Sequence, residues 1–304
     1  MLFKDYVKRF TKNVDDNKKL THLSFNGGKY NVSDEKHDEF YKMYYSSLMK
    51  NEDLYIIEKI NENSKFAFFL DIETPKEKHY IITKNDIDTI IKETLKECNL
   101  FFVDIKETEE YILSKRNNKY HVNFPNIIVK NNTAQTLIKR ILSNLSNIED
   151  KLKNLIDVSV YRTGLRLLGS KKKNETTIKE KEQEKTTKNF KEVYSIIDSE
   201  AESDDYKDLT EELFQKTIIR RKNITELTKV KEELSNEINK VCKKEKVKKA
   251  IKIKGFDNEK IVEDISKLLL NIKENDNITD NLLNKYTDLS NIGKIVATQN
   301  KSGI

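Results

Sequence analysis

Cysteine is scarce in this sequence: the chain of 304 residues has two, Cys98 and Cys242, which lie far apart and have no histidine or cysteine neighbour at metal-ligand spacing. This pattern excludes a disulfide framework and a zinc finger, and it favours a reducing compartment. No apolar run approaches the roughly 20 residues of a membrane-spanning helix. The first residues, Met-Leu-Phe-Lys-Asp, do not form a signal-peptide pattern. We therefore expect an intracellular protein that has no membrane partner.

The sequence also lacks the Gly-x-x-x-x-Gly-Lys-Ser/Thr loop, which excludes a P-loop ATPase within these residues. Positive and negative residues are also nearly balanced in number. Lysine and arginine number 57 and aspartate and glutamate 51, which gives a net charge of +6. This mild basic excess fits a nucleic-acid partner, but it equally fits an ordinary globular protein.

The most informative stretch that is present is Phe66–Glu73, an apolar run that ends in two carboxylates one residue apart. Such a run reads as a buried strand. Because side chains alternate along a strand, Asp71 and Glu73 point the same way, about 7 Å apart. Two carboxylates at a strand end are costly unless a cation neutralises them, so the pair indicates a divalent-metal site. The alternative is two solvated carboxylates that open the loop at Thr74-Pro75.

Three later segments carry chemistry of the same kind. Residues 119–129 form a strand-like run with His121, and residues 155–161 place Asp157 among strand-forming residues. The basic segment 162–172 follows directly. Three carboxylates can hold two Mg²⁺ or Mn²⁺ ions, and histidine, arginine and lysine can hold a triphosphate, which is the minimum equipment for two-metal nucleotidyl transfer.

In this order the segments resemble the archaeo-eukaryotic primase superfamily. They are most similar to the primase core of primase–helicases from large DNA viruses of the poxvirus and giant-virus type, with PrimPol-type enzymes as more distant relatives. The family's first motif, an apolar strand ending in Asp-x-Asp or Asp-x-Glu, is matched by Asp71 and Glu73. Its second motif, Ser-x-His, is matched at His121, with Lys119 where serine is common.

The third motif and the flanking segments extend the resemblance over about residues 20–225. An apolar residue followed by aspartate is matched by Ile156-Asp157, and the basic segment that follows resembles the family's phosphate-binding strand. We favour Arg166 as its triphosphate ligand because it lies between two leucines, and Ser170 and Lys172 share one face if the segment is a strand. Lys29, next to Gly27-Gly28, matches a basic nucleotide contact.

The resemblance implies a DNA primase or primase–polymerase that synthesises or extends primers by template-directed two-metal transfer. Asp71, Glu73 and Asp157 are then the catalytic metal ligands for Mg²⁺ or Mn²⁺. The implied nucleotide-binding residues are His121, Arg166, Ser170, Lys172, Lys29 and Lys119. The implied partners are single-stranded DNA template, NTP or dNTP, and a superfamily 3-type helicase, fused or separate. If the protein is viral, we expect it at a cytoplasmic replication site or in the host nucleus.

Other interpretations remain open at this point. The whole chain could be a non-catalytic relative that binds nucleic acid in a viral replication complex, although clustered acids without a metal would repel one another. A metal-dependent nuclease needs the same carboxylates but not the basic segment. At the level of residues, His121 could be a core histidine, Asp157 could cap a turn, and Lys29 could belong to a simple hairpin turn.

The expected fold is α+β: a primase-type mixed or antiparallel sheet with packed helices, followed by a mainly helical C-terminal region. We expect a catalytic domain over residues 1–225, with a linker or excursion at about 171–190 and buried contacts from Tyr194, Ile196, Ile197, Ile218 and Ile219. A helical, lysine-rich region over 226–304 follows. Its residues 243–254 hold seven lysines and one glutamate, either a solvated helix face or a DNA contact. The pattern further predicts helices over 34–49, 84–98, 133–145, 209–219, 224–241 and 259–272, and strands over 54–60, 66–72, 101–105, 119–129 and 155–161.

Overall fold

The computed structural model describes residues 1–11, 20–61, 64–75, 80–171, 194–197, 208–222, 224, 226–235 and 238. The chain divides into two compact units, residues 1–232 and 233–304, and nearly all of the described residues belong to the first. Lys172, the expected linker, the lysine-rich segment 243–254 and the expected helix 259–272 lie outside the described residues.

The first of two antiparallel sheets is built from short strands near the N-terminus and one strand from much later in the chain. Its order is β2-β1-β3-β7, with β1 His22–Ser24, β2 Lys29–Tyr30, β3 Ile56–Glu58 and β7 Leu165–Arg166. The β1–β2 turn places Gly27 and Gly28 at φ +88° and +136°, a backbone region that glycine tolerates best.

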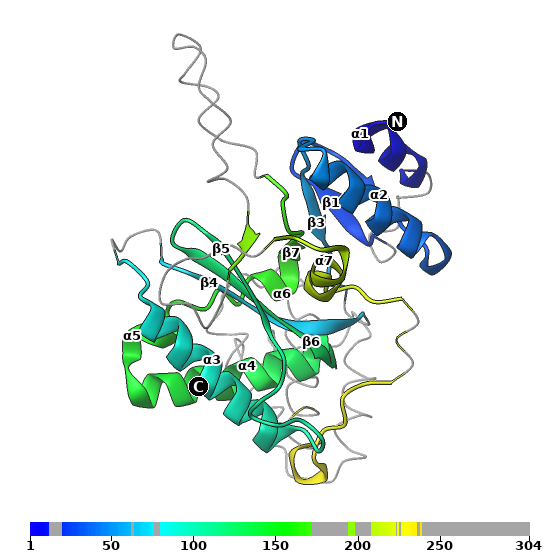
Figure 1. Cartoon of the computed structure of the whole chain (residues 1–304). Helices are drawn as coiled ribbons and strands as arrows, with labels where there is room; N and C mark the ends of the chain where they lie inside the picture. Colours follow the sequence, from blue (N-terminus) through cyan, green and yellow to red (C-terminus); the bar gives the residue numbers. More distant parts are fainter. Residues whose placement is uncertain are drawn as a thin grey trace, which may run out of the picture. The chain divides into compact units, whose positions relative to one another are not determined.

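Short N-terminal helices and one long helix bury aromatic side chains against this sheet. They are α1 Phe3–Tyr6, η1 Val7–Phe10, η2 Asp34–Lys36 and α2 His37–Met49 (Figure 1). Phe40, Tyr41 and Tyr44 of α2 are fully buried and belong to one core cluster with Tyr30 and Ile56 of the sheet. The helix predicted over 34–49 is confirmed, with its first turn in 3-10 form.

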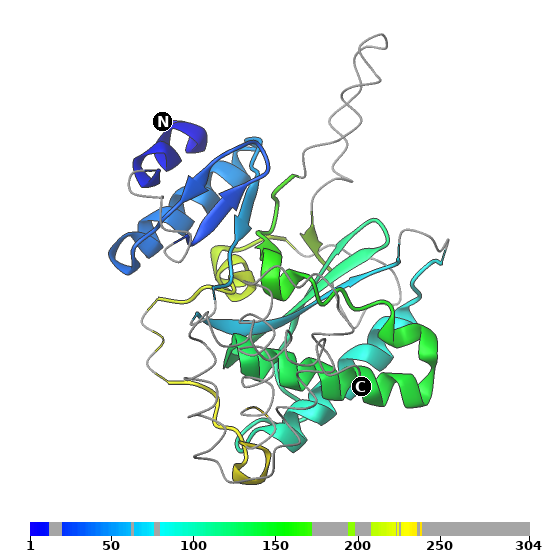
Figure 2. The same ribbon diagram turned by 180° about the vertical axis from the view of Figure 1, so that it is seen from behind.

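The second sheet has the order β4-β6-β5-β8 and is also antiparallel. Its strands are β4 Lys65–Glu73, β5 Ile112–Arg116, β6 Lys119–Lys130 and β8 Ser195–Ile196. Figures 1 and 2 show α3 (Lys84–Phe101) and α4 (Asn131–Ile148) together on one side of this sheet. Thr83 and Asp86 form a capping box at the start of α3. The predicted α+β fold with antiparallel sheets and packed helices is confirmed.

One irregularity in the second sheet makes room for a later segment. Ala67 pairs with Ile128 but Phe68 pairs with Phe124, so β6 has three extra residues at this step, the first of them Pro125. Proline cannot donate a ladder hydrogen bond, which is why strands tolerate it at such bulges. The Ala67 N–H instead donates to the carbonyl of Ile219 at 2.8 Å.

The segment around Ile219 joins the two sheets. It follows helix α7 (Glu211–Thr217), which Thr210 caps. The N–H of Ile219 donates to the buried carboxylate of Glu58 in β3 at 3.2 Å, while its carbonyl accepts from β4. The expected packing of late residues on the core is observed: the side chains of Tyr194, Ile196, Ile197, Ile218 and Ile219 are all buried.

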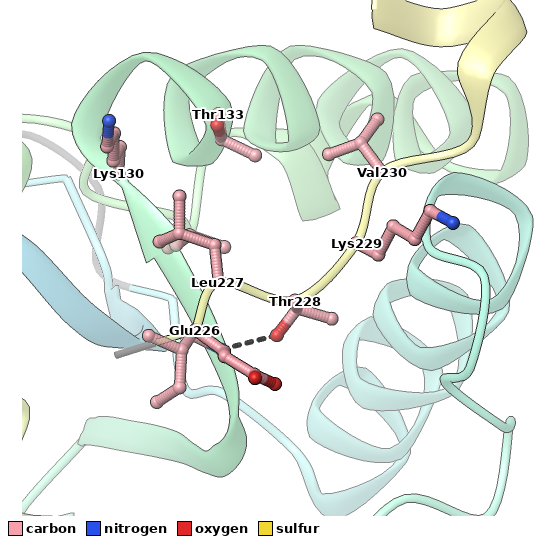
Figure 3. Close-up of a pocket in the computed structure, with 9 residues that line it drawn as sticks. Lys130, Thr133, Glu226, Leu227, Thr228, Lys229 and Val230 are labelled. Atoms are coloured by element: carbon pink, nitrogen blue, oxygen red, sulfur yellow. Dashed lines mark hydrogen bonds between the residues drawn. The ribbon is translucent and has the colours of Figure 1, made fainter. Parts of the chain in front are cut away.

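Residues 226–231 then run in extended form beside β6 and the end of α3. Thr228 N–H donates to Ile128 O at 2.9 Å, and Ile128 N–H donates to Thr228 Oγ1 at 2.7 Å. Figure 3 shows the hollow that this segment forms with the junction of β6 and α4, including Lys130 and Thr133. The helix predicted over 224–241 is therefore wrong for residues 226–231, because their backbone groups bond to β6 and α3.

Two predicted strands are also wrong. Residues 101–105 do not form a strand, because Phe101 continues the buried stripe of α3 as its last residue and Phe102 makes a single bridge to Val230. Residues 155–161 pair with β4 only at Ile156 and then turn into α6, Val160–Thr163. The remaining short helices are α5 Asp150–Lys153 and η5 Glu232–Leu234. In the described part of the chain, no helix is both long and apolar enough to cross a bilayer.

Candidate active site

Three acidic residues lie on neighbouring backbone segments at the end of β4, because backbone pairing brings the segment of the third beside the first two. Asp71 and Glu73 lie two residues apart on β4. Residues 155–157 line the other edge of this strand: Glu73 N–H donates to Leu155 O, and Asp157 N–H donates to Asp71 O, both at 2.8 Å. Asp71 therefore lies between Asp157 on one side and His121 of β6 on the other.

Asp71 is the carboxylate of the cluster whose charged form is most disfavoured. Its side chain is 13% exposed, and its Oδ1 is buried with no hydrogen-bond partner among the described residues. Burial raises the pKa of Asp71 to about 7, and the negative charges of Glu73 and Asp157 act in the same direction, while Lys119 and Arg166 oppose them. A buried acceptor without a donor, next to two other carboxylates, is a position that a cation would relieve.

The other two carboxylates already have partners. Glu73 forms an ion pair with Lys119, its neighbour across the β4–β6 pair. Asp157 accepts hydrogen bonds from Ser159 N–H at 2.8 Å and Ser159 Oγ at 3.0 Å. In this arrangement no three His, Cys, Asp or Glu side chains of the described part converge closely enough to hold a metal. The donor chemistry nevertheless fits a hard divalent cation, because the orphaned oxygen of Asp71 has two carboxylates beside it.

Asp157 lies in a loop and not in the strand that the sequence predicted. Because its carboxylate bonds to Ser159, it starts the turn that leads into α6, so the capping interpretation describes its local role. The pairing with β4 still places it beside Asp71. A capping role and a place in the acidic cluster are thus combined in one residue.

His121 is buried against the acidic cluster. Its Nε2 lies 3.6 Å from Asp71 Oδ1, beyond hydrogen-bond distance. Burial lowers the pKa of His121 well below its usual value, and the charges of Arg166, Arg116 and Lys119 lower it further. The imidazole is therefore neutral at pH 7 and offers a neutral N–H rather than a positive charge.

Arg166 approaches the cluster from the first sheet. Its Cζ lies 5.6 Å from the ring centroid of Phe25 and 5.4 Å from that of Tyr194. Its Nε and Nη1 atoms are buried without a hydrogen-bond partner in the described part of the chain. Arg166 therefore has two N–H donors without an acceptor, and its charge interacts with that of Asp71, whose Oδ1 has no donor among the described residues.

Other predicted residues are not brought to this cluster. Lys29 is exposed on the β1–β2 hairpin, at the opposite edge of its sheet from Arg166. Ser170 is fully buried, bonds to the Tyr44 hydroxyl at 2.7 Å and accepts from Ile56 N–H at 2.8 Å, so it ties α2 to β3. Arg162, the first residue of the basic segment 162–172, is exposed on α6 and does not share a strand with Arg166, as β7 has only two residues.

Sequence reasoning missed two residues of the site, Arg116 and Tyr194. Arg116 ends β5 and pairs with Lys119 across the tight turn at Asn117, where φ is +53°. That Arg-Asn-Asn-Lys turn was the available signal, since a two-residue hairpin places its flanking residues opposite each other. Tyr194 stacks on the ring of His121, with ring centroids 3.5 Å apart. Sequence spacing carries no signal for that long-range contact.

The sheet pair and this acidic and basic cluster define a primase-type α+β protein. Residues 21–184, more than half of the chain, match the family described as the C962R protein N-terminal AEP domain, in which AEP denotes the archaeo-eukaryotic primase. The chain belongs to this family, which confirms the resemblance to primases of large DNA viruses. A search of curated protein sequences found no match.

Proposed function

We propose that this protein is a DNA primase or primase–polymerase, which transfers nucleotides from NTP or dNTP to a growing primer on single-stranded DNA. The observation that carries the proposal is that the site contains two kinds of buried atoms without a hydrogen-bond partner. A carboxylate oxygen of Asp71 has no donor, and guanidinium N–H groups of Arg166 have no acceptor among the described residues. A metal–triphosphate satisfies both, because its cation binds carboxylates and its phosphates accept from arginine. Membership of the archaeo-eukaryotic primase family supports the same reaction.

The residues that would hold Mg²⁺ or Mn²⁺ are Asp71, Glu73 and Asp157. When bound, such ions lower the pKa of an attacking hydroxyl and neutralise charge on the leaving pyrophosphate. Asp71 contributes an oxygen that is already desolvated. Glu73 and Asp157 keep Lys119 and Ser159 as partners, which hold their carboxylates beside Asp71.

The basic side of the site would hold the triphosphate. Arg166 supplies buried donors in fixed geometry, which suits phosphate oxygens. Lys119 and Arg116 add positive charge from the β5–β6 hairpin. His121, neutral and buried, donates an N–H without adding a charge next to the arginines. This separation of acids and bases would place the cation and the phosphates side by side among largely buried side chains, where electrostatic interactions are strong.

The decisive experiment measures primer synthesis on single-stranded DNA with NTPs and dNTPs supplied separately and Mg²⁺ or Mn²⁺ added. We expect incorporation by the wild type and a loss of at least about 100-fold in Asp71→Asn or Asp157→Asn, because each removes a metal ligand. Asp88→Asn is the matched control, since Asp88 is exposed on α3 and pairs only with Lys84 among the described residues. Near-wild-type incorporation by either site variant would contradict the metal assignment.

A second readout does not depend on activity. Without divalent ions, Asp71→Asn should keep or raise the melting temperature, because the substitution removes the repulsion from Glu73 and Asp157. Adding Mn²⁺ should raise the melting temperature of the wild type and leave that of the variant unchanged. An equal Mn²⁺ response in both proteins would place the ion elsewhere.

The basic residues should affect nucleotide binding more than turnover. We expect His121→Ala and Arg166→Ala to raise the KM for the triphosphate by about tenfold or more, because both would contact phosphates in the ground and transition states alike. Arg162→Ala is the control, since Arg162 is exposed on α6. If both site variants kept the wild-type KM and lost only single-stranded DNA affinity, these residues would belong to the template groove.

The description of the family names the AEP domain as the N-terminal part of a protein, so further sequence follows the domain in that protein. We propose that this chain acts with a superfamily 3-type helicase, fused or separate.

The lysine-rich segment 243–254, outside the described residues, would add salt-sensitive DNA affinity. A shortened chain ending at residue 232, which keeps the first compact unit, should then bind single-stranded DNA less tightly at low salt than the full chain. Equal affinities across a salt series would indicate a solvated lysine face.

A further inference from the structure

Tyr194 enters the candidate active site from a separate part of the chain. It directly precedes β8, whose Ser195 and Ile196 pair with Lys115 and Ser114 of β5. This pairing places β8 at the edge of the second sheet, where two strands separate it from the β4 strand that carries Asp71. The side chain of Tyr194 is 2% exposed. A residue that follows the matched family segment, residues 21–184, is thus built into the site.

Three groups of the site contact its ring. The ring of His121 stacks on it with a centroid distance of 3.5 Å and an interplanar angle of 24°. The Cζ atoms of Arg116 and Arg166 each lie 5.4 Å from the centroid, within cation–π distance. The aromatic ring therefore contacts an imidazole and two guanidinium groups, which come from β5, β6 and β7.

The aromatic ring of Tyr194 contacts two buried or partly buried positive charges that disfavour each other. Burial and the charge of Arg116 both work against the charged form of Arg166. The negative face of an aromatic ring attracts a guanidinium and partly compensates this cost without consuming its hydrogen-bond donors. The Nε and Nη1 atoms of Arg166 accordingly remain without an acceptor in the described part of the chain. Donors held in place but left unsatisfied are prepared for a ligand.

We propose that Tyr194 is a positioning residue for the nucleotide: its ring holds His121 and Arg166 in the orientation that receives the triphosphate. The inference rests on the proposed function. It assigns the segment after residue 193 a role in substrate binding, although every sequence motif of the site lies before it. Only the ring is required, because the contacts that the structure shows are made by its faces.

The competing interpretation is core packing alone. Tyr194 also belongs to the large core cluster that contains Ile196 and Phe214. If this were its whole role, substitution would lower stability without a selective effect on triphosphate binding. The two interpretations therefore differ in a binding measurement and in the behaviour of a variant that keeps the ring.

The experiment measures binding of a non-hydrolysable nucleoside triphosphate by calorimetry, first without divalent cations and then with Mg²⁺. Tyr194→Phe should bind within about twofold of the wild type, because it keeps the ring. Tyr194→Leu should bind about tenfold more weakly, which corresponds to about 1.4 kcal/mol. Under turnover, its KM should rise by a similar factor while kcat stays within about threefold. Tyr45→Leu is the matched control, because Tyr45 packs on Phe214 from α2 and does not touch the site.

Tryptophan fluorescence provides a second measurement, which does not depend on whether the leucine variant folds. The chain contains no tryptophan, so Tyr194→Trp carries a single tryptophan, which serves as the fluorescent reporter at this position. Its emission should change in a saturable way when the triphosphate is added and should not change with sodium chloride of equal ionic strength. Tyr45→Trp should give no response to the triphosphate.

The outcomes separate the two claims. If the wild type binds no triphosphate with or without Mg²⁺, the proposed function fails. If the wild type binds and Tyr194→Leu binds equally well, or if Tyr194→Trp is silent during saturable binding, the positioning role is overturned and the proposed function stands. Loss of binding in both Tyr194→Phe and Tyr194→Leu would also overturn it, because the ring alone would not suffice.

Discussion

At the scale of single residues, buried ionisable groups fall into two kinds. Glu58 and His22 are buried and fully paired: Glu58 accepts from the Tyr41 hydroxyl at 2.7 Å and from two backbone N–H groups, and His22 Nε2 lies 2.9 Å from the Tyr41 hydroxyl. Asp71 and Arg166 are also largely buried but have polar atoms without partners. Because buried polar atoms are nearly always paired, the second kind is the basis for the ligand site that we propose.

The paired network at His22 predicts a pH dependence of stability. Burial lowers the pKa of His22 well below 6.5, and the charges of Arg220 and His37 lower it further. The unfolded chain therefore binds a proton below about pH 6.5 that the folded protein does not, so stability is present above that pH and is lost as the pH falls. The contribution of His22 is at most about 1.4 kcal/mol per pH unit.

Chemical unfolding of the wild type and of His22→Gln between pH 5 and 7.5 checks this prediction. We expect the wild type to lose its advantage in unfolding free energy over the variant as the pH falls from about 6.5 to 5. His121, also buried and neutral, adds the same slope to both proteins and cancels in the comparison. Parallel curves for the two proteins would refute the assignment.

At the scale of elements, one of the shortest strands carries a basic residue of the candidate site. Strand β7 has two residues, yet it carries Arg166 from the first sheet toward the acids of the second. Gly164 precedes it with φ at +102°, and a Cβ there would lie 2.3 Å from the backbone oxygen of Glu58. The close pairing of β7 with β3 therefore depends on a glycine at this position.

Gly164→Ala should lower the free energy of unfolding by about 2–4 kcal/mol, because it combines an unfavourable φ with a clash against backbone. It should also weaken triphosphate binding, since β7 positions Arg166. Gly27→Ala is the matched control: Gly27 has φ +88°, but nothing lies within 4 Å of its added Cβ, so a cost of only about 1 kcal/mol is expected. Equal losses in denaturant unfolding would show that close packing at Gly164 contributes nothing.

At the scale of the whole molecule, the fold extends beyond the segment that defines the family. The matched residues end at 184, yet the core includes Phe214, Ile218 and Ile219, which are fully or almost fully buried. Ile219 also bonds to both sheets through Glu58 and Ala67. The later segment therefore fixes how the two sheets meet, and with them the acidic and basic halves of the site.

Two shortened chains test this dependence. A chain ending at residue 232 keeps the first compact unit and should unfold in one cooperative transition. A chain ending at residue 200 keeps every sequence motif of the site but loses α7 and Ile219. We expect it to show no cooperative thermal transition, because the core that α7 covers is left exposed. Cooperative unfolding of the shorter chain, measured by calorimetry, would contradict this account.

The sequence by itself determined the elements with clear periodicity. Strands β4 and β6 and helices α3 and α4 follow from apolar runs and helical stripes, and the capping box at Thr83 marks the start of α3. The alternation along β4 placed Asp71 and Glu73 on one face. These features are local, because side-chain direction within a strand or helix depends on spacing in the sequence.

Only the tertiary structure decided how the remaining groups combine. Asp157 reaches Asp71 by pairing with an edge of β4 rather than within a strand of its own, and Ser170 is used in the core rather than in the site. Arg166 and Tyr194 meet across two sheets. Such contacts join residues far apart in the sequence, and burial of the whole core selects them, so no spacing rule encodes them.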